Sequence, residues 1–121
     1  MIINDNSKIG SIQEAFHSMF PYLKLEFFTK SINSSGISTN KMIQNAGRTL
    51  GECRTIQNSG VVTITPRMTV ADLENNFRTV YGLSVQLFRK SGKGWLETSF
   101  TESWSLEEQN SQGESLSKIA S

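Results

Sequence analysis

An internal repeat restricts the possible folds of this chain more than any other feature of its sequence. The segment from Ile9 to Ser31 aligns with the segment from Val70 to Ser91 at an offset of 61 residues, which becomes 60 after a turn. Matched pairs along the alignment include Ile12 with Leu73, Phe16 with Phe77, Leu23 with Leu83 and Phe28 with Phe88. Met1–Ile3 also matches Val62–Ile64 upstream, and the segment from Thr49 resembles the segment from Ser105 downstream. The chain is therefore predicted to use one local structure twice.

The periodicity of the apolar residues predicts a helix followed by a strand in each repeat. In each repeat, five apolar residues recur at the i, i+3, i+7, i+10 and i+11 spacing of one helix face. They are Ile9, Ile12, Phe16, Met19 and Phe20 in repeat one, and Val70, Leu73, Phe77, Val80 and Tyr81 in repeat two. Thr69 and Asp72 have the spacing of a capping box, while Pro21 and Gly82 mark the helix ends. Beyond these ends the period of the apolar residues becomes two. Leu23, Leu25 and Phe27 are predicted on one face of a strand in repeat one, and Leu83, Val85 and Leu87 on one face of a strand in repeat two.

Each repeat is predicted to continue with a further strand and a short capped helix. The SGKG sequence at Ser91–Gly94 indicates a hairpin turn into a strand at Trp95–Phe100. Repeat one has a longer polar connection, Ser31–Gly47, in which Ile37–Thr39 is a candidate strand. Capping boxes at Thr49/Glu52 and Ser105/Glu108 predict helices at Thr49–Gln57 and Ser105–Asn110, with Gly60 and Gly113 as candidate stops.

These elements predict an α+β fold in a single domain of residues 1–113, with repeat one at 1–60 and repeat two at 61–113. A disordered tail is expected at 114–121. Within each repeat the first two strands are expected to run parallel through a right-handed crossover. The result is one mixed sheet with two long helices packed on it, since a lone repeat leaves a sheet face unprotected. A ubiquitin-like grasp fold for the second half is the alternative, but it leaves the first half unexplained.

The composition argues against several classes of protein. The 121 residues contain no run of about 18 apolar residues, so no membrane-spanning helix is predicted. The N-terminal sequence lacks the pattern of a secretory signal. Twelve basic against 11 acidic residues give a net charge of +1, which does not indicate a polyanionic partner. Cys53 is the only cysteine, so no intrachain disulfide can form, and a cytoplasmic location is expected.

Groups for catalysis are scarce. His17 is the only histidine, and it lies off the apolar face of its helix. Cys53 stands beside Arg54 in a capped helix, where it is either an activated thiol or, as we predict, a buried structural residue. One histidine and one cysteine cannot complete a zinc site. The group of Glu102, Glu107 and Glu108 is better explained as charge at a helix start. We therefore predict no enzyme activity, no cofactor and no metal.

The second face of the predicted sheet is the remaining candidate site. It combines aromatic and basic side chains in the outward phase of the strands, and its predicted residues are Lys24, Phe28, Gln86, Phe88, Lys90 and Trp95. If the short helices leave Phe28 and Phe88 uncovered, exposed aromatic surface of this kind indicates an interface. If the short helices cover these two rings, they form a second small core instead.

Two functions remain open for this face. The first is a non-catalytic protein-interaction or regulatory module, which can also self-associate as a homodimer. The alternative is a domain that binds single-stranded DNA or RNA, because aromatic sheets flanked by basic residues stack bases and contact phosphates. The flanking basic residues are Lys24, Lys30, Arg89, Lys90 and Lys93.

Overall fold

The computed structural model of the chain describes residues 1–32, 34–36 and 38–119. The elements run in the order β1 (Ile2–Ile3), α1 (Ile9–Met19), β2 (Leu23–Ile32), β3 (Ser38–Met42), α2 (Leu50–Cys53), β4 (Val62–Thr63), α3 (Val70–Tyr81), β5 (Ser84–Ser91), β6 (Gly94–Glu97), a 3-10 turn η1 (Ser99–Thr101) and α4 (Leu106–Ile119). Within the described residues the fold is therefore mixed α+β, with four α-helices and two antiparallel sheets.

α1 and α3 lie where the apolar period predicts helices, but α4, predicted as a short helix, is longer than either. The Thr69 hydroxyl accepts a hydrogen bond from the Asp72 backbone N–H (3.1 Å) and the Asp72 carboxylate accepts one from the Thr69 N–H (3.2 Å). These bonds satisfy N–H groups that the first turn of α3 leaves free. Gly82 ends α3 in the left-handed conformation, with a φ of 69°. The prediction that Met19 faces the core is wrong: its side chain is 38% exposed, because α1 ends there and Phe20 takes the buried position.

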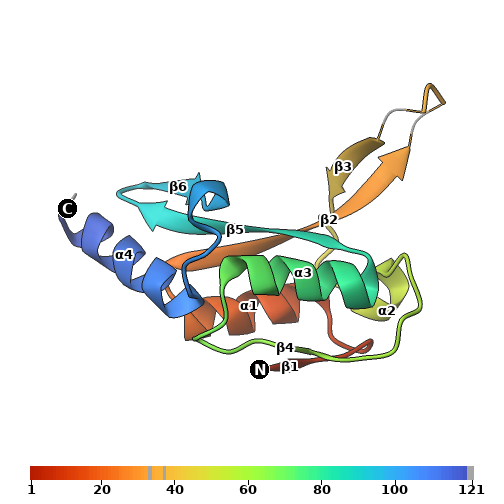
Figure 1. The fold of residues 1–121 in the computed structure, drawn as a ribbon, viewed down its shortest axis with the longest axis horizontal. Helices are drawn as coiled ribbons and strands as arrows, with labels where there is room; N and C mark the ends of the chain where they lie inside the picture. The colour runs from red at the N-terminus through yellow and green to blue at the C-terminus, as the bar shows by residue number, and fades with distance from the viewer. Residues whose placement is uncertain (33, 37, 120–121) are drawn as a thin grey trace.

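The strands form two separate sheets rather than one mixed sheet. β3, β2, β5 and β6 make a four-stranded sheet in that order, and β1 pairs with β4. The predicted parallel pairing within each repeat is therefore wrong, since every strand pair is antiparallel. In Figure 1, α1 and α3 lie between the four-stranded sheet and the short β1–β4 pair. Each long helix thus separates the two strands that flank it in sequence, which prevents them from pairing.

The register of both sheets joins residues at matching positions of the two halves. In the four-stranded sheet Glu26 pairs with Gln86, and in the two-stranded sheet Ile2 pairs with Thr63. Two isolated bridges occupy equivalent places within the two halves, Lys8 with Thr49 in the first and Thr69 with Ser105 in the second.

One hydrophobic core lies between the helices and the inner face of the four-stranded sheet. Phe27 of β2 meets Phe77 of α3 edge to face, with ring centroids 5.2 Å apart. Leu50 of α2 and Leu106 of α4 are fully buried in the same core. Both short-helix capping boxes are present, because Glu52 and Glu108 each receive a hydrogen bond from the residue three positions earlier.

The C-terminal region differs from the prediction. Gly113 is not a helix stop, because α4 continues to Ile119, through most of the segment that the sequence assigned to a tail. A Cβ at Gly113 would lie 2.9 Å from the Cβ of Tyr22, so glycine permits close contact between α4 and the start of β2. β6 ends at Glu97, earlier than predicted, and the buried Thr98 hydroxyl donates a hydrogen bond to the Leu87 carbonyl (3.1 Å).

Candidate interaction surface

The outer face of the four-stranded sheet collects all six residues that the sequence singled out. From Leu23 to Phe28 of β2 and from Ser84 to Phe88 of β5 the inner side chains are buried, whereas the alternate side chains are only half-buried. The cross-strand pairs Lys90–Trp95 and Phe88–Glu97 extend this outer face onto β6. We call this surface the outer face, and its members are Lys24, Glu26, Phe28, Ser84, Gln86, Phe88, Lys90, Trp95 and Glu97.

The short helices do not cover Phe28 and Phe88. Leu50 and Cys53 of α2, and Leu106 of α4, belong to the core on the opposite side of the sheet. Phe28 and Phe88 are not part of that core, and each is half-buried. The alternative in which these rings form a second covered core is therefore wrong.

One end of the outer face is basic and aromatic. The Lys24 ammonium lies 5.2 Å from the ring centroid of Phe88 and 5.1 Å from that of Trp95. Lys90 approaches the same Trp95 ring to 5.4 Å. The negative ring faces attract both cations, which holds the two long side chains flat on the sheet. The His17 ring lies 6.5 Å from Trp95, at the border of this group.

His17 and Gln13 lie at this end because they complete an edge of the sheet. The first half of β2 has no partner on the β3 side, where its carbonyls would otherwise stay free. His17 Nδ1 donates to the Leu23 carbonyl (2.9 Å) and Gln13 Nε2 donates to the Leu25 carbonyl (2.9 Å). His17 is exposed, as predicted, and it makes a structural contact to the strand.

The other end of the outer face is hollowed and acidic. A depression of about 370 Å³ is lined by Phe28, Asn40, Glu74, Ser84, Val85, Gln86, Phe88 and Glu97. Glu74 reaches it from α3, where burial and the charge of Glu102 raise the pKa of its carboxyl, while Arg78 opposes the shift. Glu97 is exposed on β6. We call this depression the acidic hollow.

Two of the basic residues predicted to flank the aromatic rings do not join them. Arg89 points to the inner side of the sheet, where its Nη1 donates to Gln109 Oε1 (3.0 Å) and its guanidinium lies over Trp104 at 5.6 Å. Its expected place on the outer face is therefore wrong, because Arg89 follows Leu87 in the inward phase and α4 supplies its polar partner. Lys93 lies exposed in the β5–β6 turn, and the Lys30 side chain lies outside the described residues.

The thiol of Cys53 is buried, as predicted, and it carries no sign of activation. Burial raises its pKa, and only Arg48 opposes that shift. Arg54, its neighbour in sequence, instead donates hydrogen bonds to Asp5 (2.6 Å) and to the Val80 carbonyl (2.9 Å). A thiol with a raised pKa is mostly protonated at neutral pH and is a weak nucleophile.

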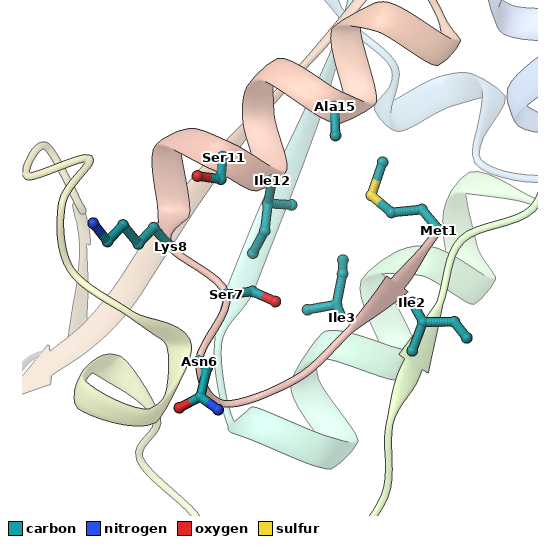
Figure 2. Close-up of a pocket in the computed structure, with 9 residues that line it drawn as sticks. All are labelled: Met1, Ile2, Ile3, Asn6, Ser7, Lys8, Ser11, Ile12 and Ala15. Atoms are coloured by element: carbon teal, nitrogen blue, oxygen red, sulfur yellow. The ribbon is translucent and has the colours of Figure 1, made fainter.

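A second depression, of about 460 Å³, lies between β1 and the start of α1. Figure 2 shows that Lys8, the only lining residue with a titratable side chain, points away from Met1 and Ile3. Ser7, Ser11 and Asn6 supply its remaining polar side-chain groups. This depression therefore brings together no acid–base pair.

No known protein family, curated protein or solved structure matches the chain. Within the described ranges, no group of three or more His, Cys, Asp or Glu side chains is placed to hold a metal ion. No helix in this part of the chain is long and apolar enough to cross a membrane. The outer face is thus the feature of the molecule from which a function can be argued.

Alternation along β2 and β5 was sufficient to identify five of the six predicted residues, and the predicted hairpin added Trp95 of β6. Glu74 and Glu97 were missed, because a helix and a neighbouring strand bring them to the hollow. One signal for the hollow was present in the repeat alignment, in which the small Ser84 is aligned with the long Lys24.

Proposed function

We propose that this protein is a non-catalytic protein-interaction module and that the outer face binds the partner. The observation that carries this proposal is the arrangement of Lys24 and Lys90 on Trp95 and Phe88, on a sheet face that no described helix covers. Tryptophan and phenylalanine supply large, rigid contact area at interfaces, and rings that stay partly exposed favour burial by a partner. A second copy of the chain is one such partner.

The charge of the outer face favours a protein partner over a nucleic acid. Lys24 and Lys90 share this face with Glu26 and Glu97, and Glu74 adjoins it. Acidic groups repel phosphates, and nucleic-acid affinity depends on net positive charge. The lysine ammonium groups also lie over the aromatic rings on which bases would have to stack.

Binding of single-stranded DNA or RNA is the second candidate function. It is supported by the two ammonium groups that lie within 5.5 Å of the Trp95 centroid, where a base and its phosphate would find both contacts. A titration of tryptophan fluorescence with a single-stranded oligonucleotide at two salt concentrations tests this function, in the variant Trp104→Phe so that Trp95 is the one tryptophan that reports. Salt-sensitive binding that depends on Lys24 and Lys90 supports it.

The test of the interaction function uses the double variant Phe88→Ser/Lys90→Glu. A protein captured by the wild-type chain from the cells that produce it is purified and titrated against both proteins. We expect the double variant to lose binding while its thermal unfolding stays nearly unchanged. The control variant Ile2→Ser/Arg67→Glu removes an exposed apolar side chain and reverses a charge away from the outer face, and it should bind normally. Sedimentation equilibrium of the purified chain tests a second copy as the partner.

A large loss of stability in Phe88→Ser/Lys90→Glu would contradict the proposal, because Phe88 would then belong to the core. Retention of full affinity would contradict it equally.

We also propose that the predicted domain of residues 1–113, extended to Ile119 by α4, is built from two copies of a single strand–helix–strand–strand–helix unit. Equivalent hydrogen bonds support it: Leu50 N–H donates to the Ser7 carbonyl, and Leu106 N–H to the Met68 carbonyl, both at 2.9 Å. The pairings Glu26–Gln86 and Ile2–Thr63 are those expected on a two-fold axis between the copies. A cytoplasmic location is proposed on the lone reduced cysteine. A crystal structure in which either pairing is shifted by one residue would refute the two-copy proposal.

A further inference from the structure

The β2–β5 ribbon presents two equivalent positions on the outer face, and only one of them is filled. An antiparallel pair has a local two-fold axis, which here passes through the Glu26–Gln86 pair. Two residues to one side Lys24 stands opposite Phe88, and two residues to the other side Ser84 stands opposite Phe28. The cross-strand neighbour of Phe88 is therefore a long cationic side chain, whereas the equivalent neighbour of Phe28 is a small hydroxyl.

The filled position shows how a basic side chain packs on this sheet. The Lys24 stem crosses from β2 to β5, and its ammonium lies 5.2 Å from the Phe88 centroid. Beside Phe28 the short Ser84 side chain leaves room, and the acidic hollow occupies that place. Ser84 matches Lys24 in the repeat. The hollow is thus the position that a lysine side chain would fill if residue 84 were also a lysine.

The charges around the hollow are those that a cation requires. Glu74 and Glu97 line it, and in the part of the chain that the structure describes neither carboxylate forms an ion pair. Arg78 lies nearby, in an adjoining depression of about 60 Å³ that also includes Glu74, but it makes no ion pair with that carboxylate. Phe28 and Phe88 add ring faces that attract a cation and an apolar wall for its methylene groups.

We propose that the acidic hollow binds a lysine or arginine side chain of the protein partner. The carboxylates of Glu74 and Glu97 contact its charged end, and the Phe28 ring contacts its stem. This inference rests on the proposed interaction function for the identity of the ligand as a protein side chain. The hollow and its charges are properties of this chain alone, so they can be tested with a small probe.

The test is a titration of the isotope-labelled protein, followed by NMR, with N-acetyl-arginine methylamide. The neutral isostere N-acetyl-citrulline methylamide is the matched control ligand, because it keeps the shape and removes the charge. At constant ionic strength we expect the arginine compound to shift the amide signals of Ser84, Gln86 and Glu97 saturably. The citrulline compound should leave them in place. Equal effects of the two compounds would overturn the inference.

A variant that fills the hollow provides the second arm. Ser84→Lys places an intramolecular lysine beside Phe28, as Lys24 lies beside Phe88, and it should abolish binding of the arginine compound. Ser11→Lys adds the same charge at an exposed position of α1, away from the hollow, and should leave binding unchanged. Unaltered binding to Ser84→Lys would overturn the inference.

If Ser84→Lys fails to fold, Glu97→Gln replaces it, because Glu97 is exposed. We expect this variant to bind the arginine compound at least threefold more weakly, and unchanged affinity would again overturn the inference.

The two proposals fail separately. If the arginine compound does not bind but Phe88→Ser/Lys90→Glu still loses the partner, only the side-chain assignment is wrong. If the compound binds and the double variant keeps the partner, the interaction function is wrong and the hollow remains a cation site.

Discussion

Replacing Phe77 by alanine should destabilise the protein far more than the same replacement of Phe88. Phe77 has no exposed surface, and its ring lies edge to face 5.2 Å from Phe27 and 6.3 Å from Tyr81. Losing the burial of the ring costs about 1.5–3 kcal/mol, and losing the aromatic contacts costs about 0.5–1.5 kcal/mol. With the cavity left behind, we expect a total loss of about 3–5 kcal/mol.

Phe88 provides the matched comparison because it lies on the opposite face of the same sheet. Its ring is half-buried, so only part of its transfer free energy is lost on truncation. Its contact with the Lys24 ammonium adds about 0.5–1 kcal/mol. We therefore expect Phe88→Ala to cost less than about 1.5 kcal/mol, as substitutions of partly exposed residues commonly do.

Urea titration at pH 7 measures both free energies of unfolding on one scale. A domain of 121 residues has a total stability of about 6–18 kcal/mol, so Phe77→Ala removes a large fraction of it. Each kcal/mol corresponds to about 4 °C in the unfolding midpoint at this chain length. Equal losses for the two variants would refute the assignment of Phe77 to the core and Phe88 to the outer face.

Three further predictions concern particular contacts. Arg54→Ala should cost about 2–4 kcal/mol in the same titration, because its side chain is 8% exposed and donates to Asp5 and to carbonyls that include Val80; a neutral result would contradict the role of these bonds. Gly113→Ala should lower the unfolding midpoint although alanine favours helices by about 1 kcal/mol, since its Cβ would meet Tyr22 at 2.9 Å; a higher midpoint would show that α4 packs more loosely. Glu74→Gln should stabilise the protein at pH 7 but not at pH 3. The folded state raises the pKa of Glu74, so ionisation of this carboxyl lowers the free energy of unfolding once the pH rises above the pKa of the unfolded chain. At a pH where the carboxyl is protonated in both states, this cost is absent. Urea titrations at the two pH values check this, and an equal gain at both would contradict it.

The sequence alone was sufficient where a structure depends on neighbouring residues. The bounds of α3 follow from the Thr69–Asp72 capping box, the apolar period and the left-handed Gly82, all of which act within one or two turns of helix. The β5–β6 hairpin follows in the same way from its glycine-containing turn. Alternation along β2 and β5 also identified Lys24, Phe28, Gln86, Phe88 and Lys90 of the outer face, because successive side chains of a strand point to opposite faces.

Apart from the β5–β6 hairpin, strand pairing was decided only by the tertiary structure. The first strand of each repeat has two residues, so its local pattern contains no information about its partner. The β1–β4 pair lies on the side of α1 and α3 away from the main sheet (Figure 1), and its residues Ile3 and Val62 belong to the same hydrophobic core as the helices. This pairing therefore depends on where both helices lie in the folded chain.

The acidic hollow depended on tertiary structure for the same reason. Ser84 comes from β5, Glu74 from α3 and Glu97 from β6, and no local pattern places them together. The position of Arg89 also depends on a distant element. Its inward side chain is stabilised by Gln109 of α4, a helix whose length the sequence underestimated. Hydrogen bonds and side-chain alternation within an element are determined by adjacent residues, whereas register, layering and cavities depend on which apolar surfaces are buried together.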